Sequence, residues 1–433
     1  MNICIVGTGY VGLVTGVCFS HLGHKVICID KDEQKITVLK GGKAPIYEPG
    51  IEELIRENVQ SGRLSFDTDL ETGVQASEVV FIAVGTPEKT DQTIDLTYVK
   101  EAASAIGKAL NGYKIIVVKS TVPVGMTKLV RKIIADQNAA SEPFSVASNP
   151  EFLREGTAVA DFLNLERAVI GTDDIQAAET LHALYRDFAG NIVMTDPATA
   201  EMTKYAANAF LATKVTFINQ IANICEKVGA DVDQVALGMG MDKRIGSSFL
   251  QAGVGYGGSC FPKDTRALAK LAREVGYPFS ILDEVIKANE LQHHRVIEKL
   301  QEIFGDLGSR TIAILGATFK PNTDDTRSAP SRKVIETLLQ HGASVKVFDP
   351  MAEAIVKDDF FRELPVSNDF YATLGGCDAA VILTEWVQIK KMNLAKVKDI
   401  LRHPVLVDGR NIFSLQQIRG EGLIYCSIGR PNI

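Results

Sequence analysis

The glycine-rich hexapeptide from Gly7 to Gly12 (GTGYVG) constrains the fold more than any other feature, because it directly follows an apolar strand pattern over Asn2–Val6. In a βαβ unit, the first glycine permits a tight turn, the second lets a pyrophosphate approach the backbone, and the third allows close packing of helix on strand. Asp30 ends the next strand pattern, where a carboxylate would bind the adenosine ribose hydroxyls and repel a 2′-phosphate. A structural glycine turn is the alternative, but the strand, helix and acid are all in register for a nucleotide. The motif therefore predicts binding of NAD rather than NADP, a preference that Lys31 and Lys35 slightly weaken.

Short β-branched runs alternate with helical patterns over the N-terminal half, which indicates βαβ units and a parallel sheet. Most of these runs are hydrophobic throughout, as is typical of strands that are covered on both faces. The predicted strands are Asn2–Val6, Lys25–Asp30, Val79–Val84, Ile115–Val118 and Phe144–Ala147. We expect a Rossmann-like NAD-binding domain over residues 1–198.

A long helical pattern without internal glycine or proline follows, from about Thr199 to Gly229. A helix of roughly thirty residues would extend about 45 Å, long enough to connect domains and to offer a dimer surface. Further helical patterns, interrupted by a loop around Cys260, predict a central helical domain over residues 199–303. The strand pattern then resumes at Arg310–Leu315, Ser344–Phe348, Ala379–Leu383 and Val405–Val407. We therefore expect an α/β protein with a second Rossmann-like, doubly wound domain over residues 304–433.

Charge and cysteine content exclude several classes of protein. The formal net charge of −7, without long basic runs, argues against a surface that binds nucleic acid. No apolar stretch approaches the roughly 20 residues that a membrane span needs, and the glycines of the N-terminal segment favour folded protein over a signal peptide. Seven cysteines without close-spaced pairs fit neither a disulfide framework nor a zinc site. We expect a cytoplasmic protein with no metal.

Cys260 alone among the cysteines lies in a glycine-rich, charged stretch, Gly255–Asp264 (GYGGSCFPKD), whereas the other six lie in apolar runs. Glycines would let a ligand lie against the backbone, and Lys263 would favour the thiolate electrostatically. Asp264 offers an acid or base within local reach. The stretch predicts a nucleophile, with a buried structural cysteine in a turn as an almost equally good alternative.

Three further groups of residues have the spacing or the position expected of a functional site. Lys204 and Asn208 are four residues apart on one face of the long predicted helix, where a cation and a neutral donor would hold an oxyanion. A solvated helix face is the alternative, and spacing alone favours it. Lys119–Pro123 (KSTVP) and Asn149–Glu155 (NPEFLRE) begin at the carboxyl ends of predicted strands, where doubly wound sheets bind ligands. Helix caps or turns would explain these two equally simply.

The combined motifs resemble those of the UDP-glucose/GDP-mannose dehydrogenase family over essentially the whole chain. They occur in the family's order: GTGYVG, VGTP from Val84, KSTVPVG from Lys119, NPEFLREG from Asn149, GYGGSCFPKD from Gly255 and GATFKPNTDDTR from Gly316. The resemblance implies a four-electron oxidation of the C6 alcohol of a nucleotide sugar to a carboxylate by two NAD. UDP-glucose is the expected substrate, on single-residue cues at Phe261 and Gly156, with GDP-mannose or UDP-N-acetylmannosamine as alternatives.

The resemblance also implies catalytic roles. The residues concerned are Thr121, Glu151, Lys204, Asn208, Cys260 and Asp264. Cys260 would attack the intermediate aldehyde to form a thiohemiacetal, and a second hydride transfer would leave a thioester for water to hydrolyse. Lys204 and Asn208 would stabilise the oxyanion, while Asp264 and Thr121 would position or activate water. The resemblance leaves open whether Lys204, Glu151 or Asp264 takes the first proton.

By the same resemblance, Glu151 would also serve as an acid–base group. The resemblance implies binding roles as well. NAD would contact Gly7, Gly9, Tyr10, Val11, Gly12, Asp30, Lys35, Thr86, Thr121, Glu155, Lys263 and Arg327. Substrate would contact Glu151, Phe152, Leu153, Arg154, Lys204, Asn208, Arg244, Phe249, Leu250, Gln251, Ala252, Gly253, Gly257, Lys320 and Arg410. Arg244 would reach the substrate of a partner subunit in a homodimer built on the long helix. Lys35 and Gln251 depart from the arginine and lysine that relatives often have, which affects affinity rather than the reaction.

Two other functional classes remain possible. A two-electron hydroxy-acid dehydrogenase would use the nucleotide fold and a helical domain, but it has no role for Cys260 and no need of a second α/β half. A non-catalytic NAD-sensing module would keep Gly7 to Gly12, yet it has little reason to keep Lys204, Asn208 and Asp264.

Overall fold

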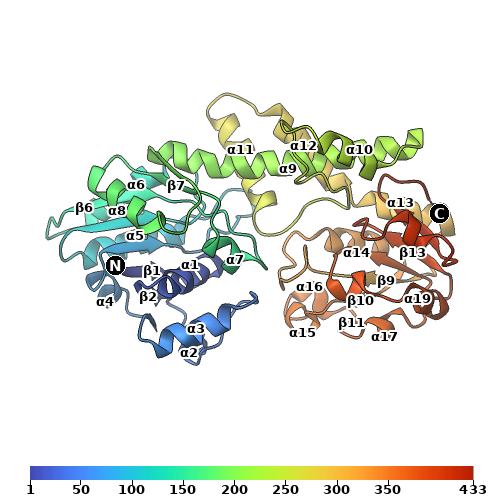
Figure 1. Ribbon diagram of the computed structural model, residues 1–433, viewed down its shortest axis with the longest axis horizontal. Coiled ribbons are helices and arrows are strands. Elements are labelled where there is room, and N and C mark those ends of the chain that lie inside the picture. The colour runs from blue at the N-terminus through green and yellow to red at the C-terminus, as the bar shows by residue number, and fades with distance from the viewer. Residues whose placement is uncertain (433) are drawn as a thin grey trace. The chain divides into compact units, whose positions relative to one another are not determined.

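A computed structural model describes residues 1–432 of the chain, which fold into two compact units, Met1–Ala207 and Asn208 onward. Each unit has one main β-sheet with helices on both faces, so the predicted α/β class is confirmed (Figure 1). The long helix α9 (Pro197–Val228) runs across the boundary between the two units. It was predicted over Thr199–Gly229 and is confirmed with slightly shifted ends.

The sheet of the first unit has eight strands among the described residues, in the order β3-β2-β1-β4-β5-β6-β7-β8. They are β1 (Asn2–Val6), β2 (Lys25–Ile29), β3 (Leu64–Asp67), β4 (Val79–Ile82), β5 (Lys114–Val118), β6 (Phe144–Ser148), β7 (Ala168–Gly171) and β8 (Ile192–Thr195). The first six follow the doubly wound order of dinucleotide-binding domains, in which the strand order reverses beside β1 and ligands bind at the carboxyl ends. β7 joins β6 by an antiparallel pairing of Gly171 with Ser148.

Helices cover both faces of this sheet. On one face lie α1 (Tyr10–His21), α2 (Glu33–Lys40), α3 (Ile51–Gln60), α7 (Ala158–Leu163) and α8 (Ile175–Tyr185). On the other lie α4 (Leu70–Gln75), α5 (Thr97–Ala109) and α6 (Met126–Gln137). The middle of α1, from Gly12 to Ser20, is buried without a break, so this helix is fixed by packing on all sides. Its N-terminus, which lies within the glycine motif, is therefore held at the carboxyl edge of the sheet.

The second unit contains a six-stranded parallel sheet in the order β11-β10-β9-β12-β13-β14 over the described residues. Its strands are β9 (Thr311–Leu315), β10 (Ser344–Phe348), β11 (Val366–Ser367), β12 (Ala379–Ile382), β13 (Val405–Asp408) and β14 (Ile424–Ser427). Renumbered from its first strand, this is again the order 3-2-1-4-5-6 of a doubly wound sheet. The prediction of a second Rossmann-like half is confirmed.

Helices of the second unit fall into two sets. Those before the sheet are α10 (Val232–Gly240), α11 (Phe261–Glu274), α12 (Ser280–Leu291) and α13 (His294–Phe304). Those between and after its strands are α14 (Pro330–Gln340), α15 (Ala352–Ile355), α16 (Asp359–Arg362), α17 (Phe370–Leu374), α18 (Val387–Lys390), α19 (Leu394–Ile400) and α20 (Leu415–Ile418). The predicted helical segment between the two sheets is therefore present, and its longest interruption precedes Phe261.

No helix within residues 1–432 is both long enough and apolar enough to cross a membrane. Within the same residues, His, Cys, Asp and Glu side chains form no group of three or more that could hold a metal ion.

Candidate active site

The glycine turn after β1 has the geometry that its sequence predicts. Gly7 has a φ of +104°, and a Cβ there would lie 2.7 Å from the carbonyl oxygen of Ala83. A Cβ on Gly12 would lie 2.0 Å from the carbonyl oxygen of Gly7, so only glycine fits at either position. A Cβ on Gly9 would meet nothing within 4 Å. The first and third glycines are thus required by the fold, whereas the second leaves open space at the N-terminus of α1, where a pyrophosphate would lie.

Asp30, at the end of β2, is held as an ionised acceptor. Its Oδ2 accepts hydrogen bonds from the backbone N–H of Thr8 at 2.8 Å and from the Thr8 hydroxyl at 2.7 Å. Its Oδ1 accepts from the N–H of Asp32 at 3.1 Å. Partial burial raises the pKa of Asp30, but the bonds from Thr8 outweigh it and the pKa lies below the ordinary value. A carboxylate beside an open glycine turn fits the adenosine half of NAD.

The different demands on Gly9 and Gly12 give a direct test. Gly9→Ala should leave the thermal midpoint close to that of the native protein, because its methyl group enters open space. It should weaken NAD binding by about tenfold or more, since the pyrophosphate needs that space. Gly12→Ala should lower the thermal midpoint markedly, because its methyl group meets backbone. Calorimetric titration with NAD and thermal unfolding measure both effects; equal NAD affinity in Gly9→Ala and the native protein would contradict this placement.

Glu151 and Lys204 form a buried ion pair within the first unit. Lys204 Nζ lies 2.9 Å from Glu151 Oε1, and the two side chains are 5% and 6% exposed. Glu151 Oε2 also accepts from the N–H of Leu153 at 2.6 Å, and Lys204 Nζ lies 5.4 Å from the centre of the Phe152 ring. Burial raises the pKa of Glu151, but the positive charge of Lys204 and its hydrogen bond bring the pKa below the ordinary value. The pair therefore presents an ammonium and a carboxylate in a dry environment.

Lys119 lies beside this pair in a network that the sequence did not predict. Its Nζ donates to Asn149 Oδ1 at 3.0 Å, and the Tyr185 hydroxyl donates to the same oxygen at 2.5 Å. Burial lowers the pKa of Lys119 to about 8, and the carboxylate of Glu151 only partly opposes that change. The KSTVP and NPEFLRE stretches, singled out for their position at strand ends, are thus joined by a buried lysine and tyrosine.

Other predicted residues of the first unit are placed as follows. Thr86 and Thr121 are half-buried in the segments that follow β4 and β5, while Lys35 and Glu155 are also half-buried. The guanidinium of Arg154 bonds to Asp161, with its Nε 3.0 Å from Oδ2.

Tyr10, predicted as an NAD contact, uses its hydroxyl on a residue that sequence reasoning missed. The hydroxyl donates to Glu48, and the N–H of Gly156 lies 2.7 Å from the same Glu48 oxygen. Glu48 also accepts from the N–H of Val159 at 3.3 Å and is only 6% exposed. This buried carboxylate joins the start of α1 to the NPEFLREG loop.

Cys260 differs from the other cysteines in its exposure. It is half-buried and forms the N-terminal cap of α11, and its Sγ lies 3.6 Å from the Ser259 hydroxyl. The N-terminus of a helix favours an anion, here the thiolate. The other six cysteines are buried, as predicted, and burial raises the pKa of Cys4 and of Cys18 to about 12. Cys260 is therefore the thiol of the described residues that is best placed to act as a nucleophile.

Asp264, on the first turn of α11, joins two of the other predicted residues. Its Oδ2 accepts from the amide Nδ2 of Asn208 at 2.6 Å, and its Oδ1 accepts from Lys263 Nζ at 2.6 Å. The Asp264 side chain is 1% exposed. Lys263 was predicted to act on the thiol, but its ammonium is neutralised first by Asp264. The predicted charge effect of Lys263 on Cys260 is therefore weaker than its sequence position suggests.

The predicted substrate contacts of the second unit differ in how far they are buried. Leu250 and Ala252 are buried in an apolar cluster, so they have backbone rather than side chain to offer a ligand. Gln251 and Arg244 are exposed. The remaining members are Phe249, Gly253, Gly257 and Lys320, together with the NAD contact Arg327, whose Nη2 lies 2.8 Å from Asp325 Oδ2.

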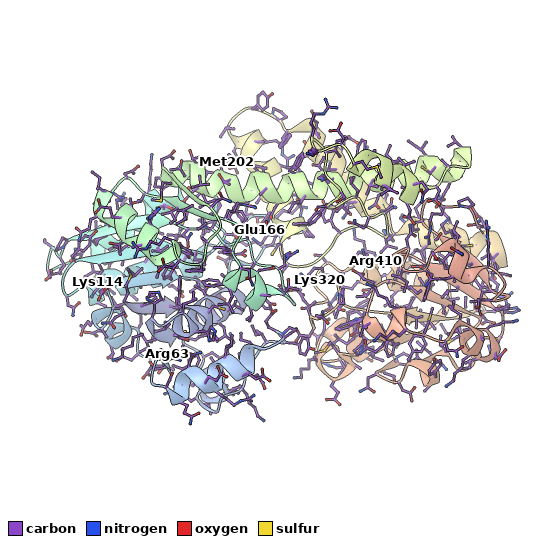
Figure 2. The ribbon with its side chains drawn as sticks, viewed as in Figure 1. Arg63, Lys114, Glu166, Met202, Lys320 and Arg410 are labelled. Atoms are coloured by element: carbon purple, nitrogen blue, oxygen red, sulfur yellow. The ribbon has the colours of Figure 1, made fainter. Side chains whose placement is uncertain are left out.

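Arg410, labelled with Lys320 in Figure 2, bonds to three backbone carbonyls. Its Nε donates to Leu383 at 2.7 Å, and its two Nη atoms donate to Gly255 and Phe319, each at 3.3 Å. The guanidinium thus ties the start of the Cys260 loop to the ends of two strands. The predicted nucleotide contact also has a structural role.

Comparison with known proteins identifies the family. Residues 1–189 match the NAD binding domain of the UDP-glucose/GDP-mannose dehydrogenase family, residues 198–291 match its central domain, and residues 313–415 match its UDP binding domain. The chain belongs to this family. The resemblance predicted from its motifs is confirmed.

Individual members of the UDP-glucose/GDP-mannose dehydrogenase family match the chain from end to end. A UDP-glucose 6-dehydrogenase of Bacillus subtilis (strain 168) is 51% identical over 432 residues, covering 100% of this chain and 94% of the relative. A UDP-glucose 6-dehydrogenase of Rhizobium meliloti (strain 1021) is 47% identical over 439 residues and is covered completely, as is this chain. The structure of a UDP-glucose dehydrogenase from Pyrobaculum islandicum matches with a TM-score of 0.91 at 38% identity, covering 99% of this chain and 98% of that one.

Proposed function

We propose that this member of the family is a UDP-glucose 6-dehydrogenase, which oxidises UDP-glucose to UDP-glucuronate with two NAD. The observation that carries the proposal is the placement of Cys260. It is a half-exposed thiol at a helix N-terminus, in a glycine-rich loop one turn before the Asp264–Asn208 pair. A two-electron hydroxy-acid dehydrogenase has no use for such a thiol. UDP-glucose is favoured over other sugars by the full-length likeness to enzymes named for that substrate.

Cys260 gives the proposed reaction its covalent step. Bound NAD supplies the hydride acceptor for both oxidations. The Cys260 thiolate adds to the C6 aldehyde that the first oxidation produces, so that a carbon–sulfur bond forms and the carbonyl electron pair moves to oxygen. Oxidation of this thiohemiacetal leaves a thioester on Cys260. Water then adds to the thioester carbon, and the thiolate leaves as the carboxylate forms. Because this cycle needs a reduced thiol, we also propose that the enzyme works in the cytoplasm.

The charged and amide side chains have complementary roles in this scheme. Lys204, which forms a buried ion pair with Glu151, stabilises the oxyanion of the thiohemiacetal together with Asn208. Asn208 donates one amide N–H to Asp264. In this scheme its other N–H donates to the oxyanion. Asp264 and Thr121 orient the hydrolytic water. Glu151 accepts the proton of the C6 hydroxyl, because its lowered pKa keeps it ionised at neutral pH.

The substrate assignment is tested by initial rates with a panel of sugar nucleotides at saturating NAD. We expect kcat/KM for UDP-glucose to exceed that for GDP-mannose and UDP-N-acetylmannosamine by about a hundredfold or more, since a site with buried polar groups discriminates strongly between hydrogen-bonding patterns. A preference for either of the other two would retain the chemistry but overturn the proposed substrate.

We further propose that the chain forms a homodimer through α9. In the second unit, this helix exposes large apolar side chains at seven-residue spacing: Phe210 is 65% exposed, Phe217 49% and Ile224 56%, and Val228 adds a fourth at 70%. Residues seven apart lie on nearly the same face of a helix, so these four form one stripe. A stripe of this size, left in water, marks a surface that pairs with another protein. Arg244, 89% exposed on its side chain, would extend from such a dimer towards the partner's substrate.

Phe217→Glu tests the dimer. A charge at the centre of the stripe should weaken dimerisation by about a hundredfold or more, because a buried unpaired carboxylate is costly. Sedimentation equilibrium should then report a mass near the 47.0 kDa of one chain instead of a dimer. Leu339→Glu, which changes a comparably exposed side chain on α14, is the matched control. A native protein that sediments as a monomer, or a Phe217→Glu variant that remains a dimer, would rule out this surface.

A further inference from the structure

The backbone that leads into Cys260 is held by hydrogen bonds to side chains and backbone from several parts of the second unit. Asn219 Oδ1 accepts from the N–H of Gly253 at 2.8 Å, and the N–H of Val254 donates to the carbonyl of Gly409 at 3.0 Å. Arg410 donates to the carbonyl of Gly255, as described above. Loops usually leave such groups to water, so a loop with this many internal partners is built to stay in one conformation.

Two side-chain amides at the end of α12 make the most specific of these contacts. Asn289 Oδ1 accepts from the N–H of Tyr256 at 2.8 Å, and its Nδ2 donates to the carbonyl of the same residue at 3.1 Å. Gln292 Nε2 donates to the carbonyl of Gly253 at 3.0 Å, and its Oε1 accepts from Asn223 at 3.0 Å. Asn289 therefore binds both polar groups of one residue in the manner of a strand partner, and Gln292 anchors the loop three residues earlier.

Gly255 leaves the space that the Asn289 side chain occupies. It has a φ of +101°, and a Cβ there would lie 2.7 Å from Asn289 Oδ1. A side chain at position 255 would thus push the amide off Tyr256. We call the hydrogen bonds of Asn289 and Gln292 to this loop the clamp. Gly255 is needed both for the turn and for the clamp, because only glycine leaves room for the Asn289 amide.

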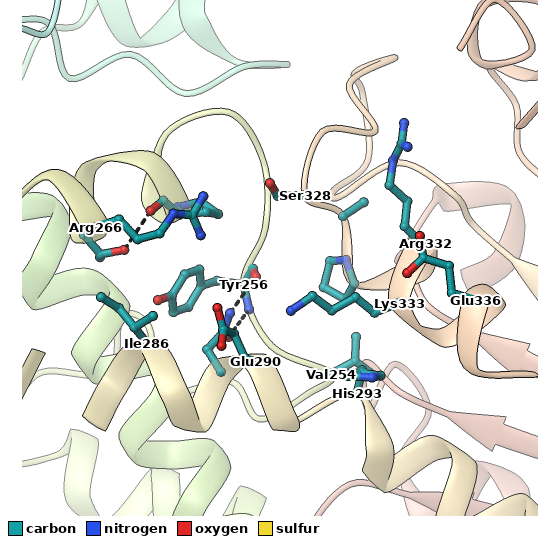
Figure 3. Close-up of a pocket in the computed structure, with 15 residues that line it drawn as sticks. Val254, Tyr256, Arg266, Ile286, Glu290, His293, Ser328, Arg332, Lys333 and Glu336 are labelled. Carbon is teal, nitrogen blue, oxygen red and sulfur yellow. Dashed lines mark hydrogen bonds between the residues drawn. The ribbon is translucent and has the colours of Figure 1, made fainter. Parts of the chain in front are cut away.

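The surroundings of Asn289 explain why the clamp persists. Asn289 and Tyr256 line a pocket of about 220 Å³, together with Pro262 and Thr265 of α11 and residues at the start of α14. The Tyr256 side chain lies on one side of this pocket (Figure 3). Its ring contacts that of Phe261, with the ring centroids 5.9 Å apart. Phe261 directly follows Cys260. Fixing Tyr256 therefore fixes the position from which α11 and its cap residue start.

We propose that Asn289 and Gln292 are positioning residues that set the place of the Cys260 thiol, acting through the backbone of Gly253 and Tyr256 rather than by touching substrate. The inference rests on the proposed function, in which Cys260 is the nucleophile. An error of about 1 Å in a reacting atom costs about a hundredfold in rate, so loss of the clamp lowers kcat although no reacting group is removed.

Two variants separate positioning from packing. Asn289→Ala removes both hydrogen bonds and leaves a space, whereas Asn289→Asp keeps the size and the acceptor but sets a carboxylate oxygen against the Tyr256 carbonyl. We expect both to lower kcat with UDP-glucose by about tenfold to a hundredfold. KM for NAD should not change, because the predicted NAD contacts lie mainly in the first unit. Glu290→Gln, the next residue on α12 and exposed in the same pocket, is the matched control and should behave as the native protein.

A second readout needs no turnover. Alkylation of Cys260 by iodoacetamide, followed by peptide mass spectrometry in the absence of substrate, should be faster in both Asn289 variants than in Glu290→Gln, because the released loop exposes the half-buried thiol. If Asn289→Asp alkylates and turns over like the control, the amide only fills space and the proposal is wrong. If the native protein fails to oxidise UDP-glucose, the proposed function is lost, while the alkylation rates still decide whether the clamp sets the thiol.

Discussion

Replacing Cys260 with serine should lower net formation of UDP-glucuronate by about a thousandfold or more. The hydroxyl is a far weaker nucleophile than the thiolate, and its ester would hydrolyse more slowly than a thioester. The first oxidation does not use the thiol, so residual activity should stop at the aldehyde level. Product chromatography after long incubation with NAD measures the acid directly.

Ser259→Ala provides the matched control for Cys260→Ser, because it changes the neighbouring side chain of the same loop by a single oxygen. We expect only a modest loss for this variant. Near-native acid formation by Cys260→Ser would contradict the covalent mechanism. An equal loss in both variants would mean that the loop, rather than the thiol, had been damaged.

Removal of Lys204 should have the largest effect on stability. Lys204→Met leaves Glu151 charged, buried and without its cation, which costs about 3–5 kcal/mol for a buried ion pair that is broken on one side. We expect a clearly lower urea midpoint for the first unit, and no measurable activity. The double variant Lys204→Met/Glu151→Gln, which removes both charges, should recover most of the midpoint but none of the activity.

The pH dependence of the stability of Lys204→Met shows whether the loss comes from the unpaired charge of Glu151 or from a packing defect. In the native protein Glu151 has a lowered pKa, so its contribution to stability is present above the ordinary value of 4.5 and is lost as pH falls further. Without Lys204 the burial of Glu151 raises its pKa, so the variant gains stability relative to the native protein as pH falls. The gap between their urea midpoints should narrow from pH 7 to pH 5. A constant gap would point to packing alone.

The parts of the fold that the sequence predicted are those that depend on local pattern. Strands such as β4 and β12 are continuous apolar runs between turns, and α9 is a long helical pattern without a breaker. Strands β3, β7, β8, β11 and β14 were not predicted, because their place in a sheet depends on tertiary pairing with neighbouring strands. The antiparallel step from β6 to β7 likewise has no local signal.

The residues of the candidate site likewise include some that local motifs predicted and others that they did not. Motif spacing singled out Asp264, Asn208 and Cys260, and α11 and α9 bring the first two into contact. Glu48 and Tyr185 were not predicted, because their partners lie far away in sequence and neither residue belongs to one of the recognised motifs. A buried polar residue is recognised by its hydrogen-bond partner, and the fold rather than the spacing in sequence determines which residue that partner is.

The measurement that tests the central claim most directly is the number of NADH formed per UDP-glucose when the sugar nucleotide is limiting and NAD is in excess. The proposed function requires two, with UDP-glucuronate as the product and with the second NADH lost in Cys260→Ser. One NADH per sugar in the native protein would mean that oxidation stops at the aldehyde and that Cys260 has no covalent role, which would contradict the proposed reaction.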